Sequence, residues 1–469
     1  MAPSSHRPPH RKSVPPPHRR GRGGRRRSLG KKIDDDDGGD GGGSITADTM
    51  TCVRDLKETK PTTCDDCTMQ YTGWTVPNDN YMLPIINIAD LTPEVFYNQY
   101  IRLRRPIVLT GMLPDLSGIE MWKDDNYLQS MLGGQSVMVE RRSSTHDTFG
   151  EGIKVQMNFL RFLELMINDN DEMHYLTTQD VPTNSDGKPD LMSPLMKELK
   201  TDFPLRPKLM GNLVPQNINL WMGNAANGAS SGLHHDYHDN LYIVLKGRKR
   251  FRLYSPLDAK KMYTTGELRK VHPNGRINYN GEETTAAGLD PATLVTWRKK
   301  EAEKMLEDAE RAVEEGKPGA QEQLEQAEHL LNMAMDAVLD AEIHEDSDLH
   351  RHRIDDTTAK RPNNFSKVEV KYLDDKETLK VKYPEFLDAN AAFCTLEAGS
   401  MLYLPASWFH EVTSYGTRDG HMAMNYWFHP PDGVDFVAPY SSDFWTNDFY
   451  ERFDSKAGIS EATTISQQR

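Results

Sequence analysis

The sequence predicts a mainly β fold with flanking helices and one helical insertion. Short runs of apolar and β-branched residues recur along the chain and end at glycine, proline or asparagine, which is typical of strands. Residues 290–345 are instead rich in Ala, Glu, Lys, Leu and Gln, with apolar residues at helical spacing. Histidine and aspartate cluster beside two of the predicted strands, which indicates a metal site held by a sheet.

The first elements are a strand at residues 83–88 and a helix that begins after Thr92, because Thr92 is a good N-cap and Pro93 suits the first turn. The other predicted elements, in chain order, are a strand at 105–111, a helix at 155–168, strands at 173–176 and 217–223, a β-hairpin at 242–254 that turns at Gly247, two helices within 297–343 joined by a turn at 316–319, and further strands from 369 to 428.

Composition divides the chain into a tail and a body. Residues 1–50 have almost no apolar side chain to offset the entropy of ordering, so we expect disorder there. The predicted organisation is a tail at 1–50 that is first basic and then acidic, a linker at 51–81, a folded domain at 82–450, a helical hairpin at 290–345 inserted within it, and a C-terminal tail at 451–469. Loop insertions cost little free energy, so the hairpin is compatible with one domain.

The charge distribution limits the classes of partner. Residues 1–32 contain 11 Lys and Arg and no Asp or Glu, which leaves 45 basic against 70 acidic residues in the rest of the chain. A body this acidic repels nucleic acid and anionic membranes, so only the basic tail could contact nucleic acid or serve as a nuclear import signal. No run of about 18 apolar residues and no signal-peptide core occurs, so we expect no membrane span. Four cysteines favour a reducing compartment, the cytoplasm or nucleus, and leave the role of Cys64 and Cys67 open.

The stretch from Ser231 to Val244 carries the strongest chemical signal. Alternate residues of a strand share a face, so His234 and Asp236 can bind one ion while His235 points away. Two histidines and one carboxylate leave three coordination positions open, the arrangement of non-haem Fe(II) oxygenases. His410, which follows an apolar strand and a turn at Pro405, is the candidate for the third ligand. Asp236 and His238 have the same alternation and remain a local alternative from spacing alone.

Residues 233–256 and 402–412 resemble the JmjC (Jumonji-C, cupin-type) Fe(II)- and 2-oxoglutarate-dependent oxygenases, and most of all the small branch of lysyl and asparaginyl hydroxylases. The resemblance implies a double-stranded β-helix, also called a cupin or jelly roll. It implies Fe(II) at His234, Asp236 and His410, with 2-oxoglutarate as cosubstrate beside O2. It also favours His234 over His238, because this choice places Asn240 and Lys249 in the family register.

Lys249 is predicted to share an inward face with Phe251 and Leu253, where a buried ammonium group needs an anion partner. By resemblance, that partner is the distal carboxylate of 2-oxoglutarate. The other residues that the resemblance assigns to the 2-oxoglutarate pocket are Ser231, Asn240, Tyr175, Asn425 and Trp427.

The resemblance implies hydroxylation of a protein side chain, of lysine or asparagine type, and a homodimer formed through the C-terminal segment. A JmjC histone or protein demethylase is an alternative, although 4 cysteines cannot build the zinc-bound readers that often accompany one. A tRNA-modifying oxygenase is a second alternative, which the acidic charge of the body disfavours. A third is a non-catalytic cupin-fold protein that docks partners through the helical insertion. The sequence does not identify the substrate.

Overall fold

A computed structural model of the chain describes residues 68–454 apart from 146, 151, 169–170, 186, 349–360 and 418. The predicted basic tail, most of the linker, Cys64 and Cys67, and residues 455–469 lie outside this part of the chain. Among the described residues, no helix is both long and apolar enough to cross a membrane.

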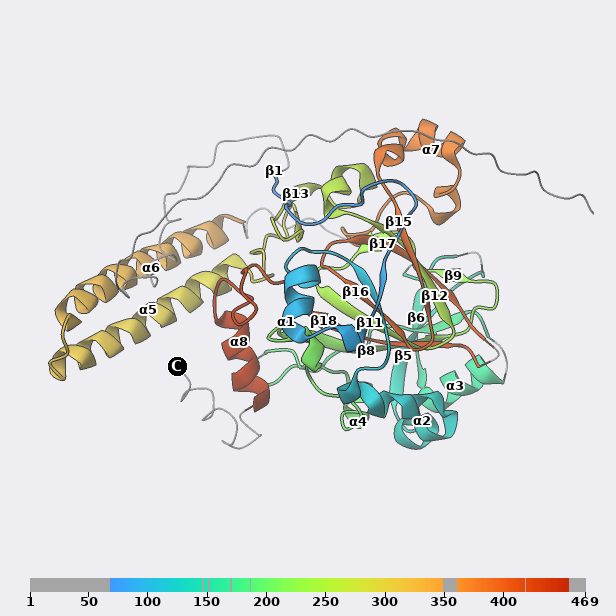
Figure 1. Cartoon of the computed structure of the whole chain (residues 1–469), viewed down its shortest axis with the longest axis horizontal. Helices are drawn as coiled ribbons and strands as arrows, with labels where there is room; N and C mark the ends of the chain where they lie inside the picture. The colour runs from blue at the N-terminus through green and yellow to red at the C-terminus, as the bar shows by residue number, and fades with distance from the viewer. Residues whose placement is uncertain are drawn as a thin grey trace, which may run out of the picture. The chain divides into compact units, whose positions relative to one another are not determined.

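Two large sheets form the body (Figure 1). The first has the order β3 (Ile85–Asn87), β4 (Ile107–Thr110), β16 (Ser400–Leu404), β11 (Asp239–Lys246), β18 (His421–Phe428), β8 (Pro215–Gly223), β7 (His174–Leu176), β5 (Ser136–Arg141), β6 (Ile153–Asn158). The second has the order β10 (His234–His235), β17 (Phe409–Tyr415), β12 (Arg248–Tyr254), β15 (Ala392–Glu397), β2 (Tyr81–Met82), with β9 (Ala229–Ser230) also on β17. A small third sheet joins β1 (Thr68–Met69), β13 (Leu268–Val271) and β14 (Ile277–Tyr279).

Alternation along β11 shows how one strand serves two cores. Tyr242 and Val244 face β12 and pack with Phe251 and Leu253, so the two sheets share an apolar layer. The intervening residues of β11 face the opposite way into a larger core that helices cover. These helices are α1 (Pro93–Phe96), α2 (Asp125–Leu132), α3 (Phe159–Ile167) and α4 (Pro194–Glu198). The predicted mainly β, jelly-roll class is confirmed.

The predicted hairpin at Gly247 is wrong in its pairing. The strands β11 and β12 do follow one another with a turn at Gly247, but β11 pairs with β16 and β18, whereas β12 pairs with β15 and β17. The chain therefore crosses from one sheet to the other at Gly247, whose φ of 72° favours glycine. A Cβ atom there would lie 2.5 Å from the Tyr415 carbonyl oxygen. Composition marks this turn but not which strands pair.

Two other predicted boundaries shift. The predicted helix at 155–168 begins as strand β6, and α3 starts only at Phe159, where the Asn158 side chain accepts a hydrogen bond from the Leu160 amide. Strands do not resume at 369, because helical turns and α7 (Lys376–Lys382) precede β15. The N-cap at Thr92 is as predicted, with its hydroxyl accepting from the Val95 amide.

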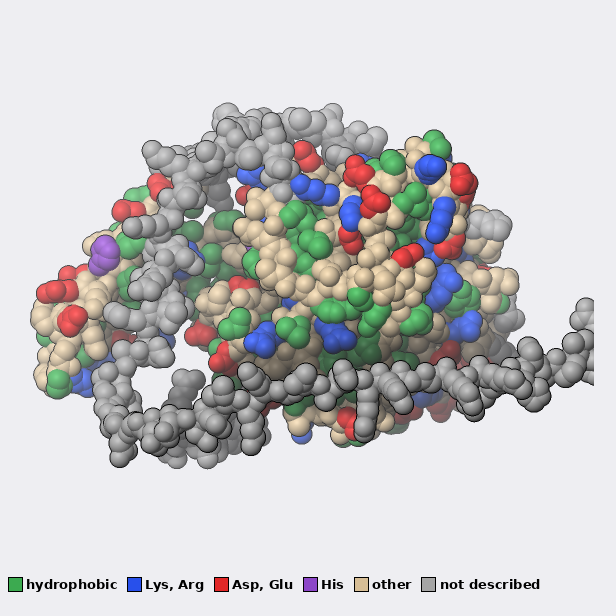
Figure 2. All heavy atoms as spheres, turned by 45° about the horizontal axis from the view of Figure 1, so that its top comes forward, with side chains coloured by type: hydrophobic (Ala, Val, Ile, Leu, Met, Phe, Trp, Pro, Cys, Tyr) green, Lys and Arg blue, Asp and Glu red, His purple; other side chains and the backbone are tan. Residues whose placement is uncertain are grey.

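The inserted segment forms two long antiparallel helices, α5 (Pro291–Glu314) and α6 (Ala320–Asp348), which lie side by side in Figure 1. Alanines of both helices are buried where the two approach. Near the start of α5, Trp297 meets Phe444 of α8 (Phe444–Phe449) edge to face, with ring centroids 5.4 Å apart. On the face shown in Figure 2, acidic and basic side chains are interspersed with apolar ones.

A buried ion pair ties distant parts of the body together. Arg104, which precedes β4, donates two hydrogen bonds to the Asp239 carboxylate at the start of β11, one of them 2.8 Å long. The same carboxylate accepts from the Tyr403 hydroxyl at 2.6 Å and from the Ala406 amide at 2.9 Å. Asp239 is fully buried and Arg104 is nearly so. The Asp239 carboxylate therefore accepts four hydrogen bonds, so its removal leaves the Arg104 guanidinium and the other donors unpaired away from water.

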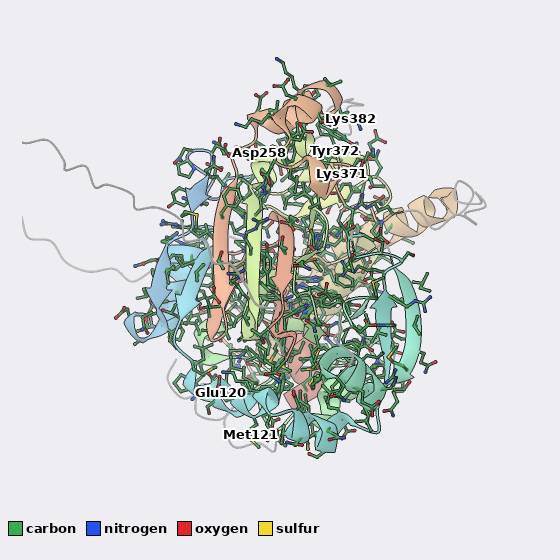
Figure 3. All side chains as sticks on the ribbon, turned by 90° about the vertical axis from the view of Figure 1, so that its right-hand side faces the viewer. Glu120, Met121, Asp258, Lys371, Tyr372 and Lys382 are labelled. Carbon is green, nitrogen blue, oxygen red and sulfur yellow. The ribbon has the colours of Figure 1, made fainter. Side chains whose placement is uncertain are left out.

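Replacing Asp239 by Asn is expected to destabilise the protein strongly, because it leaves the buried Arg104 charge without a counterion. The expected loss is roughly 3–5 kcal/mol of unfolding free energy, measured by urea denaturation. The control is Glu120→Gln, which breaks the exposed Lys123–Glu120 pair at the end of the body where Figure 3 labels Glu120. This control should change stability by less than about 1 kcal/mol. Equal effects of the two substitutions would contradict the role given to Asp239.

Candidate metal centre

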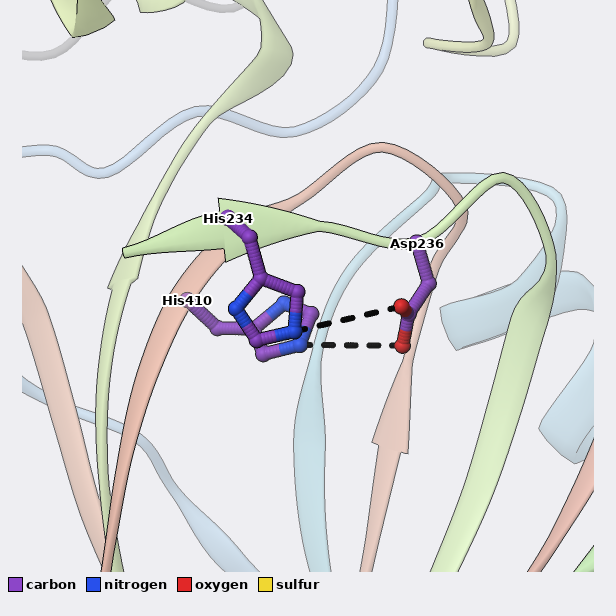
Figure 4. Close-up of side chains that lie close together, drawn as sticks. All are labelled: His234, Asp236 and His410. Carbon is purple, nitrogen blue, oxygen red and sulfur yellow. Dashed lines mark ion pairs between the residues drawn. The ribbon is translucent and has the colours of Figure 1, made fainter. Parts of the chain in front are cut away.

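Pairing of two short strands brings the predicted ligands together. β10 and β17 are antiparallel, and His234 stands directly opposite His410. Asp236 follows just beyond β10 and turns back toward both rings (Figure 4). Its Oδ2 lies 3.6 Å from His410 Nε2, and its Oδ1 lies 4.0 Å from His234 Nε2. One ligand atom from each residue lies within 4.8 Å of the other two, which is a distance set that one metal ion can bridge.

Backbone carbonyls set the orientation of both imidazoles. His234 Nδ1 lies 3.1 Å from the Gly232 oxygen, and His410 Nδ1 lies 2.9 Å from the Trp408 oxygen. A carbonyl oxygen only accepts, so Nδ1 carries the proton and Nε2 presents its lone pair toward Asp236. Burial, and secondarily the nearby His410, lowers the pKa of His234 to about 4. The ring is therefore neutral near pH 7, the form that binds a metal.

The neighbouring histidines lie elsewhere. His235 is fully buried on the other side of β10, where its Nε2 lies 2.8 Å from the Tyr279 hydroxyl. His238 lies against Trp427 and His429, with ring centroids 6.2 Å and 5.7 Å away. The geometry therefore groups Asp236 with His234 rather than with His238.

The triad opens into a cavity of about 460 Å³. Lys249 lies in the same cavity although its side chain is only 1% exposed. Its Nζ donates to Ser414 Oγ at 2.7 Å and to the Tyr175 hydroxyl at 3.2 Å. Burial lowers the pKa of Lys249 to about 7, and no carboxylate among the described residues forms an ion pair with it. An anionic ligand in the cavity would supply the missing partner.

The other predicted pocket residues divide into two groups. Ser231, Asn240, Tyr175 and Trp427 line the cavity as expected. Asn425 is not a lining residue, although it lies on the same strand as Trp427, because its side chain is fully buried beneath the lining. Its amide nitrogen donates to Asn240 Oδ1 at 3.0 Å, and its oxygen accepts from Trp221 Nε1 at 2.8 Å. Asn425 thus supports the lining from behind.

Sequence reasoning missed several lining residues. Ser414 and Tyr242 share inward faces with predicted residues, since they lie four residues after His410 on β17 and two after Asn240 on β11. That alternation could have identified both. Trp221 and Phe365 also line the cavity. Phe365 follows the helical insertion and carries no motif, so no sequence signal pointed to it.

Comparison with known proteins identifies the family of the chain. A family model described as a cupin-like domain matches residues 93–433. The chain is 37% identical over 429 residues to JmjC domain-containing protein 4 of Schizosaccharomyces pombe, covering 79% of this chain and 89% of that protein. The chain belongs to the JmjC family. These cupin-like proteins are Fe(II)- and 2-oxoglutarate-dependent oxygenases.

Two more distant JmjC relatives are named for different activities. The human bifunctional peptidase and (3S)-lysyl hydroxylase JMJD7 is 24% identical over 340 residues, covering 72% of this chain and 81% of that protein. Lysine-specific demethylase JMJ32 of Arabidopsis thaliana is 21% identical over 363 residues, covering 72% of this chain and 79% of that protein.

The residues present fit the JmjC cofactors. Two imidazole nitrogens and one carboxylate are the donor set of a site that leaves coordination positions open for Fe(II) chemistry. The buried Lys249, with the hydroxyls of Tyr175 and Ser414 beside it, fits the carboxylate of a 2-oxo acid. His234, Asp236 and His410 would hold the metal, and Lys249 would hold the acid.

Substitution of His234 or Asp236 by Ala should weaken Co(II) binding, measured by calorimetry. The loss should exceed the roughly 10- to 100-fold that removal of an outer-shell partner costs. His238→Ala is the matched control and should bind Co(II) like the unsubstituted protein, because its ring lies with Trp427 and His429. Loss of binding in the His238 variant, with binding retained in the His234 variant, would reverse the assignment.

The affinity for 2-oxoglutarate should depend on pH through Lys249. Below its pKa of about 7 the ammonium is charged in the free protein, so affinity is constant. Above that value, binding requires uptake of a proton, and affinity falls by up to about tenfold per pH unit. Calorimetry on Mn(II)-loaded protein between pH 6 and 9 measures the slope.

The control for this profile is Lys249→Arg, because a guanidinium stays charged across the whole range. Its profile should be flat at any affinity that it retains. A flat profile for the unsubstituted protein as well would show that Lys249 does not titrate with the ligand.

Proposed function

We propose that the protein is an Fe(II)- and 2-oxoglutarate-dependent dioxygenase that hydroxylates a protein side chain, of lysine or asparagine type. One observation carries this proposal: a 2-His-1-carboxylate triad shares one cavity with a buried lysine that has no ion-pair partner among the described residues. The overall reaction would convert a substrate C–H, O2 and 2-oxoglutarate into C–OH, succinate and CO2. Family membership supports the reaction class, and the finer choice of a side-chain hydroxylase rests on the resemblance to the lysyl and asparaginyl hydroxylases.

Fe(II) bound at the triad supplies the activation of O2 that is coupled to oxidative decarboxylation of 2-oxoglutarate. The protein's own residues position and shield the reactants. Lys249 would bind the distal carboxylate, while Tyr175 and Ser414 fix its ammonium group. Trp221 and Tyr242 line the cavity as bulky walls that limit water. No side chain is required as a nucleophile.

The cavity also bears on the substrate. Glu140 lines it with a nearly buried carboxylate, of which Oε1 accepts from the amides of Gly150 and Gly152 at 2.6 Å and 2.8 Å. A carboxylate in this wall favours a cationic lysine over a neutral asparagine. The human JmjC relative JMJD7 is named as a lysyl hydroxylase, which supports the same choice. A protein with this function would work in the cytoplasm or nucleus.

Succinate production from 2-oxoglutarate by anaerobically Fe(II)-loaded protein, exposed to air with a peptide pool, tests the proposal. Peptides should stimulate succinate formation, and His234→Ala should abolish it because one metal ligand is lost. The His238→Ala control should retain stimulation. Binding of Fe(II) and 2-oxoglutarate without stimulated turnover by any peptide or lysate fraction would contradict the proposal and favour a protein that binds partners without catalysis.

A further inference from the structure

The segment that follows the helical insertion forms part of the metal centre. Arg361 is the first described residue after α6, and the chain from there runs antiparallel to β10, with Phe365 paired to His234. Two backbone hydrogen bonds flank this pair, from the His235 amide to the Asn364 oxygen at 3.2 Å and from the Ser366 amide to the Leu233 oxygen at 2.8 Å. The segment therefore forms an antiparallel bridge to the edge that carries the first predicted ligand.

The Phe365 ring covers the His234 imidazole. The two rings lie 4.9 Å apart between centroids and are nearly parallel, at 12°. The Arg361 guanidinium lies over the same phenyl ring, 5.2 Å from its centroid. Gly150 packs on the ring edge so closely that a Cβ atom there would lie 3.3 Å from two phenyl carbons. The phenyl ring is thus held by three neighbours and has little freedom to move.

This contact restrains a motion that the hydrogen bond alone leaves open. The outer torsion of a histidine side chain has a broad, roughly two-fold profile, so the ring plane needs restraint from its surroundings. Gly232 accepts from the edge of the His234 ring, and Phe365 covers its face. His410 has its own carbonyl partner but meets His234 only at a tilt of 57°. The face contact is therefore specific to His234.

We propose that Phe365 is a positioning residue that fixes the plane of the His234 ring. Residues 361–366, which follow the helical insertion, are therefore required for full metal affinity. This inference rests on the proposed metal centre. It also makes the insertion more than a surface loop, because its returning chain shapes the site. Any partner that moves residues 361–366 would change metal affinity.

The test compares Phe365→Leu, which keeps an apolar side chain but loses the stacked ring, with Phe365→Tyr, which keeps the ring. The probe is Co(II), followed by calorimetry and by its visible absorption bands on the full chain. The matched control is Phe393→Leu, since Phe393 is also half-buried and also lies under an arginine, with the Arg252 guanidinium 5.1 Å from its centroid. Phe393 is absent from the cavity lining.

We expect Phe365→Leu to weaken Co(II) binding by about 10- to 100-fold and to alter the Co(II) spectrum. Phe365→Tyr should stay within about threefold of the unsubstituted protein, and Phe393→Leu should match it. Both leucine variants should lose similar thermal stability, which separates positioning from a loss of packing. Equal Co(II) affinity in Phe365→Leu and the unsubstituted protein would overturn the inference alone. Absence of Co(II) binding in the unsubstituted protein would overturn the proposed metal centre as well.

Discussion

The buried Asp239 carboxylate is the constraint on which the site depends most. It joins three segments that are far apart in the sequence: the chain before β4, the start of β11 and the turn between β16 and β17. Asp236 lies three residues before it, and His410 lies four residues after its partner Ala406. The Ser407 amide adds a hydrogen bond of 2.7 Å to the Asp236 carbonyl oxygen. These hydrogen bonds therefore fix the segment that carries His234 and Asp236 relative to the segment that carries His410.

The cavity that the triad lines combines groups whose burial costs free energy. Lys249 is desolvated and forms no ion pair with any carboxylate among the described residues, and burial lowers the pKa of His234. Groups in this state favour binding of the ligands that satisfy them, and such ligands stabilise the folded protein in turn. A divalent metal ion would supply positive charge between the triad ligands, and a dicarboxylate would supply negative charge beside Lys249. The proposed function therefore follows from the electrostatics of these buried groups.

The sequence was sufficient wherever alternation or spacing within one strand decides the outcome. It placed His234 and Lys249 inward and His235 outward, because residues of one strand alternate, whereas Asp236 lies just beyond β10 and turns back toward the histidines. It was insufficient where distant segments decide. The turn at Gly247 connects different sheets, and Asn425 is buried behind the lining by its hydrogen bonds with Asn240 and Trp221. Phe365 reaches the cavity from a segment without a motif, and Arg104 supports the site only through Asp239, so only the folded chain reveals their roles.

The metal assignment can be tested by diffraction at the iron absorption edge from anaerobic crystals grown with Fe(II) and 2-oxoglutarate. We expect one strong anomalous peak next to His234 Nε2, Asp236 and His410 Nε2, with the 2-oxoglutarate carboxylate at Lys249. A peak at another histidine, or a fully bound 2-oxoglutarate that does not contact Lys249, would contradict it.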